Sequence, residues 1–231
     1  MARRIYLDSH EISPDAALVT VATRRAPSCA ARPESVAQTR QRVMRAVDMG
    51  DFAKAIAMLN RLLTHHPTSA EDYSNRGLIY LWSGHPHKAL RDFNHAIALA
   101  PELPAAYNNR ANCYAAQGQL EAAIADYERT IDLNPFHVRA RINYAITLRE
   151  LDRYDAALEV LDEALLFRQL AGDIYAERGR TYHIRGDWNC AVADYRRALK
   201  FFPLPLADAP LSISPRRQQV MGWLTELQPP G

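Results

Sequence analysis

The chain has 231 residues, of which 48% are hydrophobic and 23% are charged, and its formal net charge is +2. This composition is typical of a globular protein and argues against a wholly disordered chain. The near balance of charge argues against a dedicated nucleic-acid binder, which normally carries a strong basic excess.

The first 35 residues contain no repeat, and Pro14, Pro27 and Pro33 interrupt them. We expect a flexible tail over residues 1–35, with a short hairpin from residues 5–7 and 18–21 as the alternative. The apolar stretch at residues 16–22 is too short and poorly flanked for a secretory signal. No run approaches the roughly 20 apolar residues of a transmembrane helix, and three scattered cysteines suit a reducing compartment. We therefore expect a cytoplasmic protein without a membrane span.

A period of 34 residues follows the tail and is marked by Pro67, Pro101 and Pro135. It divides the chain into five units, at residues 36–69, 70–103, 104–137, 138–171 and 172–205. Two columns of the alignment have no exception. One holds only alanine and the other only large apolar residues, namely Ala55, Ala89, Ala123, Ala157 and Ala191, and Leu59, Phe93, Tyr127, Leu161 and Tyr195.

Each unit contains two helical patterns, for example residues 70–83 and 86–99. Tyr73, Gly77 and Tyr80 are spaced by four and three residues, so they lie on one stripe of a helix. Gly84 follows the first pattern, where a left-handed residue ends a helix, and Pro101 prevents the second from continuing. A unit this short cannot bury its apolar face alone, so neighbouring units must stack.

The period and its columns resemble the tetratricopeptide repeat (TPR) family. The resemblance covers all five units without an insertion, and it implies an all-α, right-handed α-solenoid of five TPR helix pairs. Pentatricopeptide and Sel1-like repeats are the near alternatives, and their longer periods disfavour them. In the TPR family, the first helix of each pair lines a concave groove.

An arginine column and an aspartate column indicate an ion pair within single units. Arginine precedes the small-residue column in the units that also have aspartate before the large apolar column, and the fourth unit lacks both. The pairs are Arg76 with Asp92, Arg110 with Asp126, and Arg178 with Asp194. We expect these pairs to be structural and to contribute about 0–1 kcal/mol if they are exposed to solvent.

The end of the chain predicts a linker and one more helix over residues 206–231. Prolines crowd residues 203–215, and Ser214 with Pro215 makes a good helix start. Val220, Met221, Trp223, Leu224 and Leu227 then share one broad face. We interpret this segment as a C-terminal capping helix, which terminal repeats need. The alternative is a docking helix for another protein, through Trp223.

The sequence contains none of the common catalytic motifs. There is no phosphate-binding loop, no zinc-protease motif, no serine-hydrolase elbow and no dinucleotide-binding glycine pattern. The paired histidines His65–His66 and the turn histidines His85 and His87 lack convergent Cys, Asp or Glu partners. We therefore expect no enzyme activity, no cofactor and no metal site.

The resemblance places candidate peptide-binding residues on the groove-facing side of the first helices. Asparagine recurs at one position in three adjacent units, at Asn75, Asn109 and Asn143. An amide both donates and accepts hydrogen bonds, so such a ladder suits the backbone of an extended peptide. The same asparagines can instead cap or bridge neighbouring helices. The full candidate set is Asn75, Asn108, Asn109, Asn112, Arg139, Asn143, Arg149, Arg180 and Trp82.

The three arginines of this set favour an acidic ligand segment. The chaperone-tail clamp of some TPR domains does not fit, because Ser74 and Leu78 stand where it needs a lysine and an asparagine. We expect a non-enzymatic interaction module or assembly factor that binds a protein or peptide. The alternatives are a regulatory or targeting subunit that docks through its C-terminal helix, and an enzyme-accessory or RNA-associated protein. We expect no nucleic-acid partner, and the oligomeric state stays open.

Overall fold

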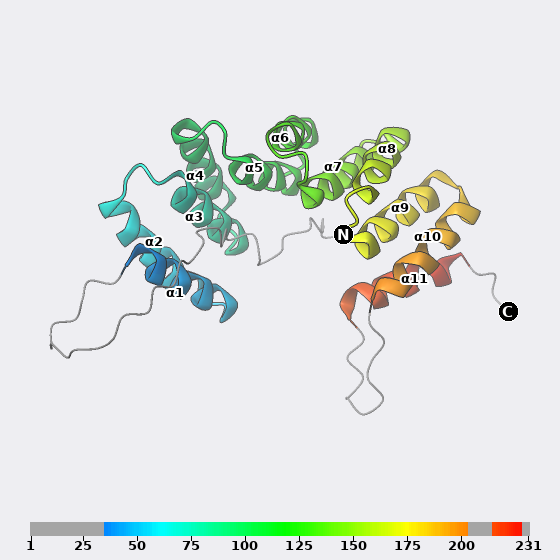
Figure 1. The fold of residues 1–231 in the computed structure, drawn as a ribbon, viewed down its shortest axis with the longest axis horizontal. Coiled ribbons are helices and arrows are strands. Elements are labelled where there is room, and N and C mark those ends of the chain that lie inside the picture. The colour runs from blue at the N-terminus through cyan, green and yellow to red at the C-terminus, as the bar shows by residue number, and fades with distance from the viewer. Residues whose placement is uncertain (1–34, 203–213, 228–231) are drawn as a thin grey trace, which may run out of the picture. The chain divides into compact units, whose positions relative to one another are not determined.

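The computed structural model describes residues 35–202 and 214–227, which form eleven α-helices and no strand (Figure 1). The all-α prediction is confirmed for these residues. The expected tail, its alternative hairpin and nearly all of the proline-rich linker lie outside the described residues. The helices are α1 (Val36–Asp48), α2 (Phe52–His65), α3 (Ala70–Trp82), α4 (Pro86–Leu99), α5 (Pro104–Ala116), α6 (Leu120–Leu133), α7 (Val138–Glu150), α8 (Tyr154–Leu165), α9 (Ala171–Arg185), α10 (Trp188–Phe201) and α11 (Pro215–Glu226).

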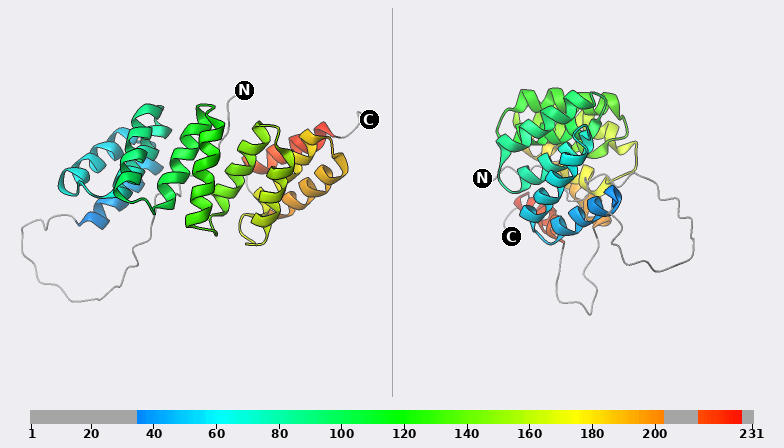
Figure 2. Two further views of the ribbon diagram at one scale, coloured as in Figure 1. Left: turned by 90° about the horizontal axis from the view of Figure 1, so that it is seen from above. Right: turned by 90° about the vertical axis from the view of Figure 1, so that its left-hand side faces the viewer.

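The described residues belong to two compact units, and the division falls inside α5, between Cys113 and Tyr114. In the first compact unit α1 packs on α2, α2 on α3, and α3 on α4. In the second compact unit each helix from α7 to α11 packs on the one before it, as Figure 2 shows for the last pairs. Within each compact unit, the helices therefore stack in chain order.

A seam of small residues lets the two helices of a pair approach closely. The five alanines of the exceptionless column all have 0% exposed area. A Cβ atom added at Gly77 would lie 2.6 Å from Cε1 of Phe93 and 3.2 Å from the Ala89 carbonyl oxygen. Gly179 has the same relation to Tyr195 and Ala191. The small-residue columns thus make room for the large aromatic rings of the partner helices.

The turn inside each pair uses a left-handed residue to end the first helix. Gly84 has a φ of 80°, and the next residue, His85, donates its backbone N–H to the Tyr80 carbonyl at 2.8 Å. Asp152 takes the glycine's place in the fourth unit with a φ of 59°. The Tyr154 hydroxyl donates to the Asp152 carboxylate at 2.5 Å, which supports this turn.

The arginine–aspartate pair within a unit is confirmed in two units. Arg76 donates two parallel hydrogen bonds of 2.7 Å to Asp92, and Arg178 does the same to Asp194 at 2.6 and 2.9 Å. The aspartates are more buried than we expected, since Asp194 is only 1% exposed. These pairs therefore contribute more to stability than solvent-exposed pairs do, because an unpaired buried charge is costly.

The same arginines also reach back to the preceding unit. Arg76 Nη1 donates to Asn60 Oδ1 at 2.7 Å, and Arg178 Nη1 donates to Asp162 Oδ1 at 2.5 Å. In the fourth unit the Tyr144 hydroxyl makes this backward bond, to Glu128 Oε1 at 2.7 Å. In the second and fifth units this column of side chains joins the two helices of a pair, and in the second, fourth and fifth units it ties the pair to the preceding one.

The close approach at Gly77 predicts a specific cost. Gly77→Ala should lower the free energy of unfolding by about 1–3 kcal/mol, because Phe93 and the Ala89 backbone cannot both give way. Gly222→Ala is the control, since nothing lies within 4 Å of its added Cβ, and it should raise stability by about 0.5–1 kcal/mol. Urea unfolding measures both, and equal effects would contradict the seam.

The buried pair predicts a second difference. Arg178→Gln should lower the free energy of unfolding by about 3 kcal/mol, the low end for a broken buried pair, because the buried Asp194 then keeps only the exposed Arg197 as its partner. Arg153→Gln breaks the solvent-exposed pair with Glu121 and should cost less than about 1 kcal/mol. Thermal unfolding of the two variants decides whether burial sets the cost, and similar melting shifts would refute it.

Candidate functional site

Polar side chains of α3 and α5 meet within the first compact unit. Asn109 Nδ2 donates to Ser74 Oγ at 3.2 Å, which is a bridge between consecutive units. Asn109 is 1% exposed, and its Oδ1 has no hydrogen-bond partner among the described residues. Asn75 is 8% exposed, and its side chain has no hydrogen bond within the described part of the chain. Unused amide capacity therefore gathers at this place.

The other candidates of the first compact unit have partners within the chain. Asn108 and Asn112 on α5 are fully buried, and each has an interaction partner within the chain. Trp82 is half-buried at the end of α3, with its ring centroid 6.5 Å from that of Phe52. It packs against the apolar clusters of α1–α2 and α3–α4. Trp82 therefore contributes to the core.

The candidates of the second compact unit fall into two groups. Asn143 is buried on α7 and Arg139 is half-buried in the first turn of the same helix, and each has a partner within the chain. Arg149, at the end of α7, donates to Glu177 Oε2 on α9 at 2.9 Å. It also donates to the Glu177 carbonyl oxygen at 3.2 Å. The fold itself therefore uses the Arg149 guanidinium.

Glu177 lies between two arginines, one from α7 and one from α11. Arg216 donates to Glu177 Oε1 at 2.7 Å and to Asp173 Oδ1 at 3.1 Å. Burial alone would raise the pKa of Glu177, but the charges and hydrogen bonds of Arg149 and Arg216 outweigh it and lower that pKa. Glu177 therefore stays ionised and connects α7, α9 and α11.

Arg180 also makes its contacts with α11. Its guanidinium donates to Glu226 at 3.0 Å and lies 5.3 Å from the ring centroid of Trp223. His183 lies beside it, and burial, followed by the charge of Arg180, lowers the pKa of His183. These contacts place Arg180 inside the interface between α9 and α11.

Helix α11 covers the end of α9 and α10 through a small apolar cluster. Val220 is fully buried, and the Trp223 ring lies 5.8 Å from that of Tyr195. Ser214 caps the helix start, as predicted, by accepting from the Arg217 backbone N–H at 3.2 Å. Met221, which the sequence placed on the same face, is exposed instead. The face that carries Trp223 thus packs on the chain's own repeats. Figure 2 shows α11 beside α10.

Two residues of this interface, Arg216 and Glu226, are not among the candidates that the sequence predicts. Their partners lie 39 to 46 residues away, so no local pattern reveals them. The pattern that could have indicated them is the opposite charge of the two segments, since Asp173 and Glu177 are acidic and the start of α11 is basic. The candidate residues thus form one group around Asn75 and Asn109 in the first compact unit. A second group lies around α7, α9 and α11 in the second.

Two properties of the described residues, their metal-ligating groups and the apolar length of their helices, bear on the site chemistry. No cluster of three or more His, Cys, Asp or Glu side chains suitable for a metal ion occurs in residues 35–202 and 214–227. Within the same ranges, none of the helices combines the length and the apolar character that a bilayer crossing requires.

The interface of α11 predicts a stability effect. Arg216→Gln should lower the free energy of unfolding by about 3 kcal/mol, the low end for a broken buried pair, because Glu177 keeps Arg149. Gln218→Ala, at an exposed position of the same helix, should change it by no more than about 0.5 kcal/mol. Guanidinium unfolding followed by tryptophan fluorescence compares the variants. Indistinguishable curves would show that Arg216 does not hold α11.

The sequence models of the tetratricopeptide repeat family match residues 42–111 and residues 104–137. Among solved structures, MamA is 22% identical with a TM-score of 0.60, over 68% of this chain and 92% of that one. The thermophilic TPR protein TTC0263 of Thermus thermophilus is 20% identical with a TM-score of 0.64, over 80% and 96%. YrrB, described as a TPR protein with an unusual peptide-binding site, is 17% identical with a TM-score of 0.56, over 72% and 86%.

No curated protein sequence matches this chain. The structural similarities are below 25% identity, so they show the fold, and they agree with the predicted right-handed α-solenoid of TPR helix pairs. The 34-residue columns, the pairs that stack in chain order and the two family matches lead to one conclusion. The chain contains tetratricopeptide repeats over residues 42–137.

Proposed function

We propose that this protein is a non-enzymatic interaction module or assembly factor that holds an extended segment of a partner protein along the first helices of its repeats. The TPR fold supports a protein-interaction module. The peptide-binding site named for YrrB supports a peptide as the ligand. The charge balance and the absence of catalytic motifs in the sequence agree with a binding role.

The unused amide capacity of Asn75 and Asn109 carries the proposal. These residues stand 34 positions apart in consecutive first helices. A buried acceptor without a partner costs about 1–3 kcal/mol, and a ligand backbone N–H at Asn109 Oδ1 would remove that cost. Asn75 offers both a donor and an acceptor to the next peptide group. Such contacts recognise a backbone and leave the ligand sequence free.

The proposed contact set is narrower than the sequence-derived set. It keeps Asn75 and Asn109 of the first compact unit, and it adds Ser74, which orients the Asn109 amide. It leaves out Asn143 and Arg139, each of which has a partner within the chain. We leave out Arg149 and Arg180 because carboxylates of the chain itself bind both guanidinium groups. We also leave out Trp82, since its ring packs into the core.

The alternatives receive less support from the described residues. Docking of a partner through the C-terminal helix needs its apolar face, but Trp223 and Val220 pack on α9 and α10. An RNA-associated role needs a row of free basic groups, whereas Arg149, Arg178 and Arg180 are all in ion pairs. Groove binding of a protein segment therefore remains the best-supported function.

An affinity capture experiment with mass spectrometry tests this function. Wild-type protein and the single variant Asn75→Ala are used as baits in the same lysate. The variant should lose its specific partners by about tenfold, which corresponds to the loss of one or two hydrogen bonds of about 1 kcal/mol each. Asn75 is preferred to Asn109 because its replacement leaves no buried hydroxyl without its donor.

Asn189→Ala is the matched control, since it removes an exposed asparagine from α10. It should capture the wild-type set of partners. Circular dichroism confirms that all baits remain folded. An unchanged partner set with Asn75→Ala would refute groove binding, and a set that disappears steeply with added salt would indicate nucleic-acid contacts instead.

A further inference from the structure

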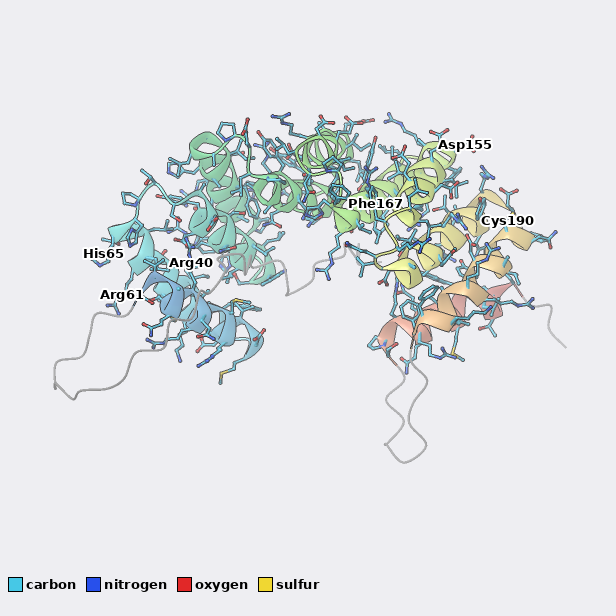
Figure 3. All side chains as sticks on the ribbon, viewed as in Figure 1. Arg40, Arg61, His65, Asp155, Phe167 and Cys190 are labelled. Atoms are coloured by element: carbon cyan, nitrogen blue, oxygen red, sulfur yellow. The ribbon has the colours of Figure 1, made fainter. Side chains whose placement is uncertain are left out.

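Large apolar side chains lie exposed at one corner of the second compact unit. Phe136 lies in the turn between α6 and α7, and Leu166 and Phe167 directly follow α8. Phe136 is 69% exposed and Leu166 is 78% exposed. The rings of Phe136 and Phe167 meet edge to face, with centroids 5.5 Å apart. We call these three residues the apolar corner; Figure 3 labels Phe167, at the opposite end of α8 from Asp155.

The other repeats show that the fold does not require apolar residues at the two exposed positions. Thr68 and Glu102 take the place of Phe136 in the first and second units. The place of Leu166 is taken by Thr64, Ala98 and Asp132 in the first three units. A partner that covers exposed aromatic and aliphatic side chains removes apolar surface from water, which is favourable in free energy. Leucine stands at the place of Phe136 in the fourth and fifth units, at Leu170 and Leu204, but the first two units show that the fold forms without an apolar residue there.

The backbone of the same turn departs from the repeat. Arg168 and Leu170 have φ values of 55° and 50°, in the left-handed region that residues other than glycine rarely adopt. Gln169 stands where Pro67, Pro101 and Pro135 mark the period. Strained residues of this kind concentrate at functional sites. The strain here lies next to the exposed Leu166.

One uncompensated positive charge lies beside the apolar corner. Arg168 is exposed and has no ion pair within the described residues. The Arg141 guanidinium lies 5.3 Å from the Phe167 ring centroid and donates to Glu163, so these two charges cancel. His137 accepts the Ala140 backbone N–H, and burial lowers its pKa, so it is neutral at pH 7. Arg168 is thus the uncompensated charge of the turn.

We propose that the apolar corner is a docking site for an acidic protein segment with an aromatic or aliphatic anchor. The anchor covers Phe136 and Leu166, and a neighbouring carboxylate of the partner pairs with Arg168. A second copy of this chain fits less well, because two corners brought face to face would place two Arg168 side chains together. The corner is separate from the proposed peptide contacts at Asn75 and Asn109.

Fluorescence anisotropy with three labelled peptides tests the docking site. The probes are acetyl-Glu-Asp-Phe-Leu-Glu-Asp-amide, the same peptide with Ala-Ala in its centre, and the same peptide with Lys in place of each acidic residue. The full-length protein should bind the first probe about tenfold more tightly than either of the other two. Equal binding of the lysine or the alanine probe, or no binding of the first probe, would overturn the proposal.

The repeats supply substitutions that the fold already accepts. Phe136→Thr and Leu166→Thr introduce the residues found at the same places in the first unit. Each should weaken binding of the acidic probe about tenfold. Arg168→Asn removes the charge while asparagine tolerates the left-handed backbone, and it should reduce the salt dependence of binding. Leu99→Thr, at an exposed leucine of the first compact unit, is the control and should bind as wild type.

Two further measurements distinguish the docking site from the proposed groove and from self-association. Asn75→Ala should bind the acidic probe as wild type does, so failure of the proposed groove function leaves this test intact. Unchanged binding by Phe136→Thr and Leu166→Thr would overturn the docking site. Sedimentation equilibrium would also overturn it if wild-type protein formed dimers that Phe136→Thr loses, since the occupant would then be a second copy.

Discussion

The structure depends on how closely the two helices of each pair can approach. At the seam, a fully buried alanine of the second helix faces a small residue of the first, as with Ala89 and Gly77. Because no side chain separates the backbones there, Phe93 and Tyr195 lie directly over glycines and are fully buried. The remaining apolar surface of a pair can be buried only against the next pair.

Ion pairs fix the arrangement that packing allows. The arginines at 76 and 178 each bind an aspartate of their own unit and a polar group of the preceding unit. At the end of the second compact unit, Glu177 binds both Arg149 and Arg216 and so attaches α11. These charged groups are therefore paired with one another inside the protein. Among the described residues, Arg168 is an exposed arginine without such a pair.

The sequence predicts the fold well, because a helix pair is a local structure and its period repeats along the chain. It also predicts the Arg–Asp pair, since the two residues are lost together in the fourth unit. It does not predict the depth of Asn108 and Asn112 or the partners of Arg180, because these depend on packing between segments far apart in sequence. In the sequence, Phe136 of the apolar corner differs from Thr68 and Glu102 at the same repeat position. A residue that departs from the repeat is not revealed by the features that the units share.

Hydrogen exchange with mass spectrometry at increasing denaturant tests the central claim most directly, namely that the seam makes each helix pair one unit. The account predicts that the amides of α9 and α10 lose protection together, at one denaturant concentration, and that α3 and α4 do the same. Loss of protection in α10 while α9 stays protected would contradict it, because the seam would then not hold the pair together.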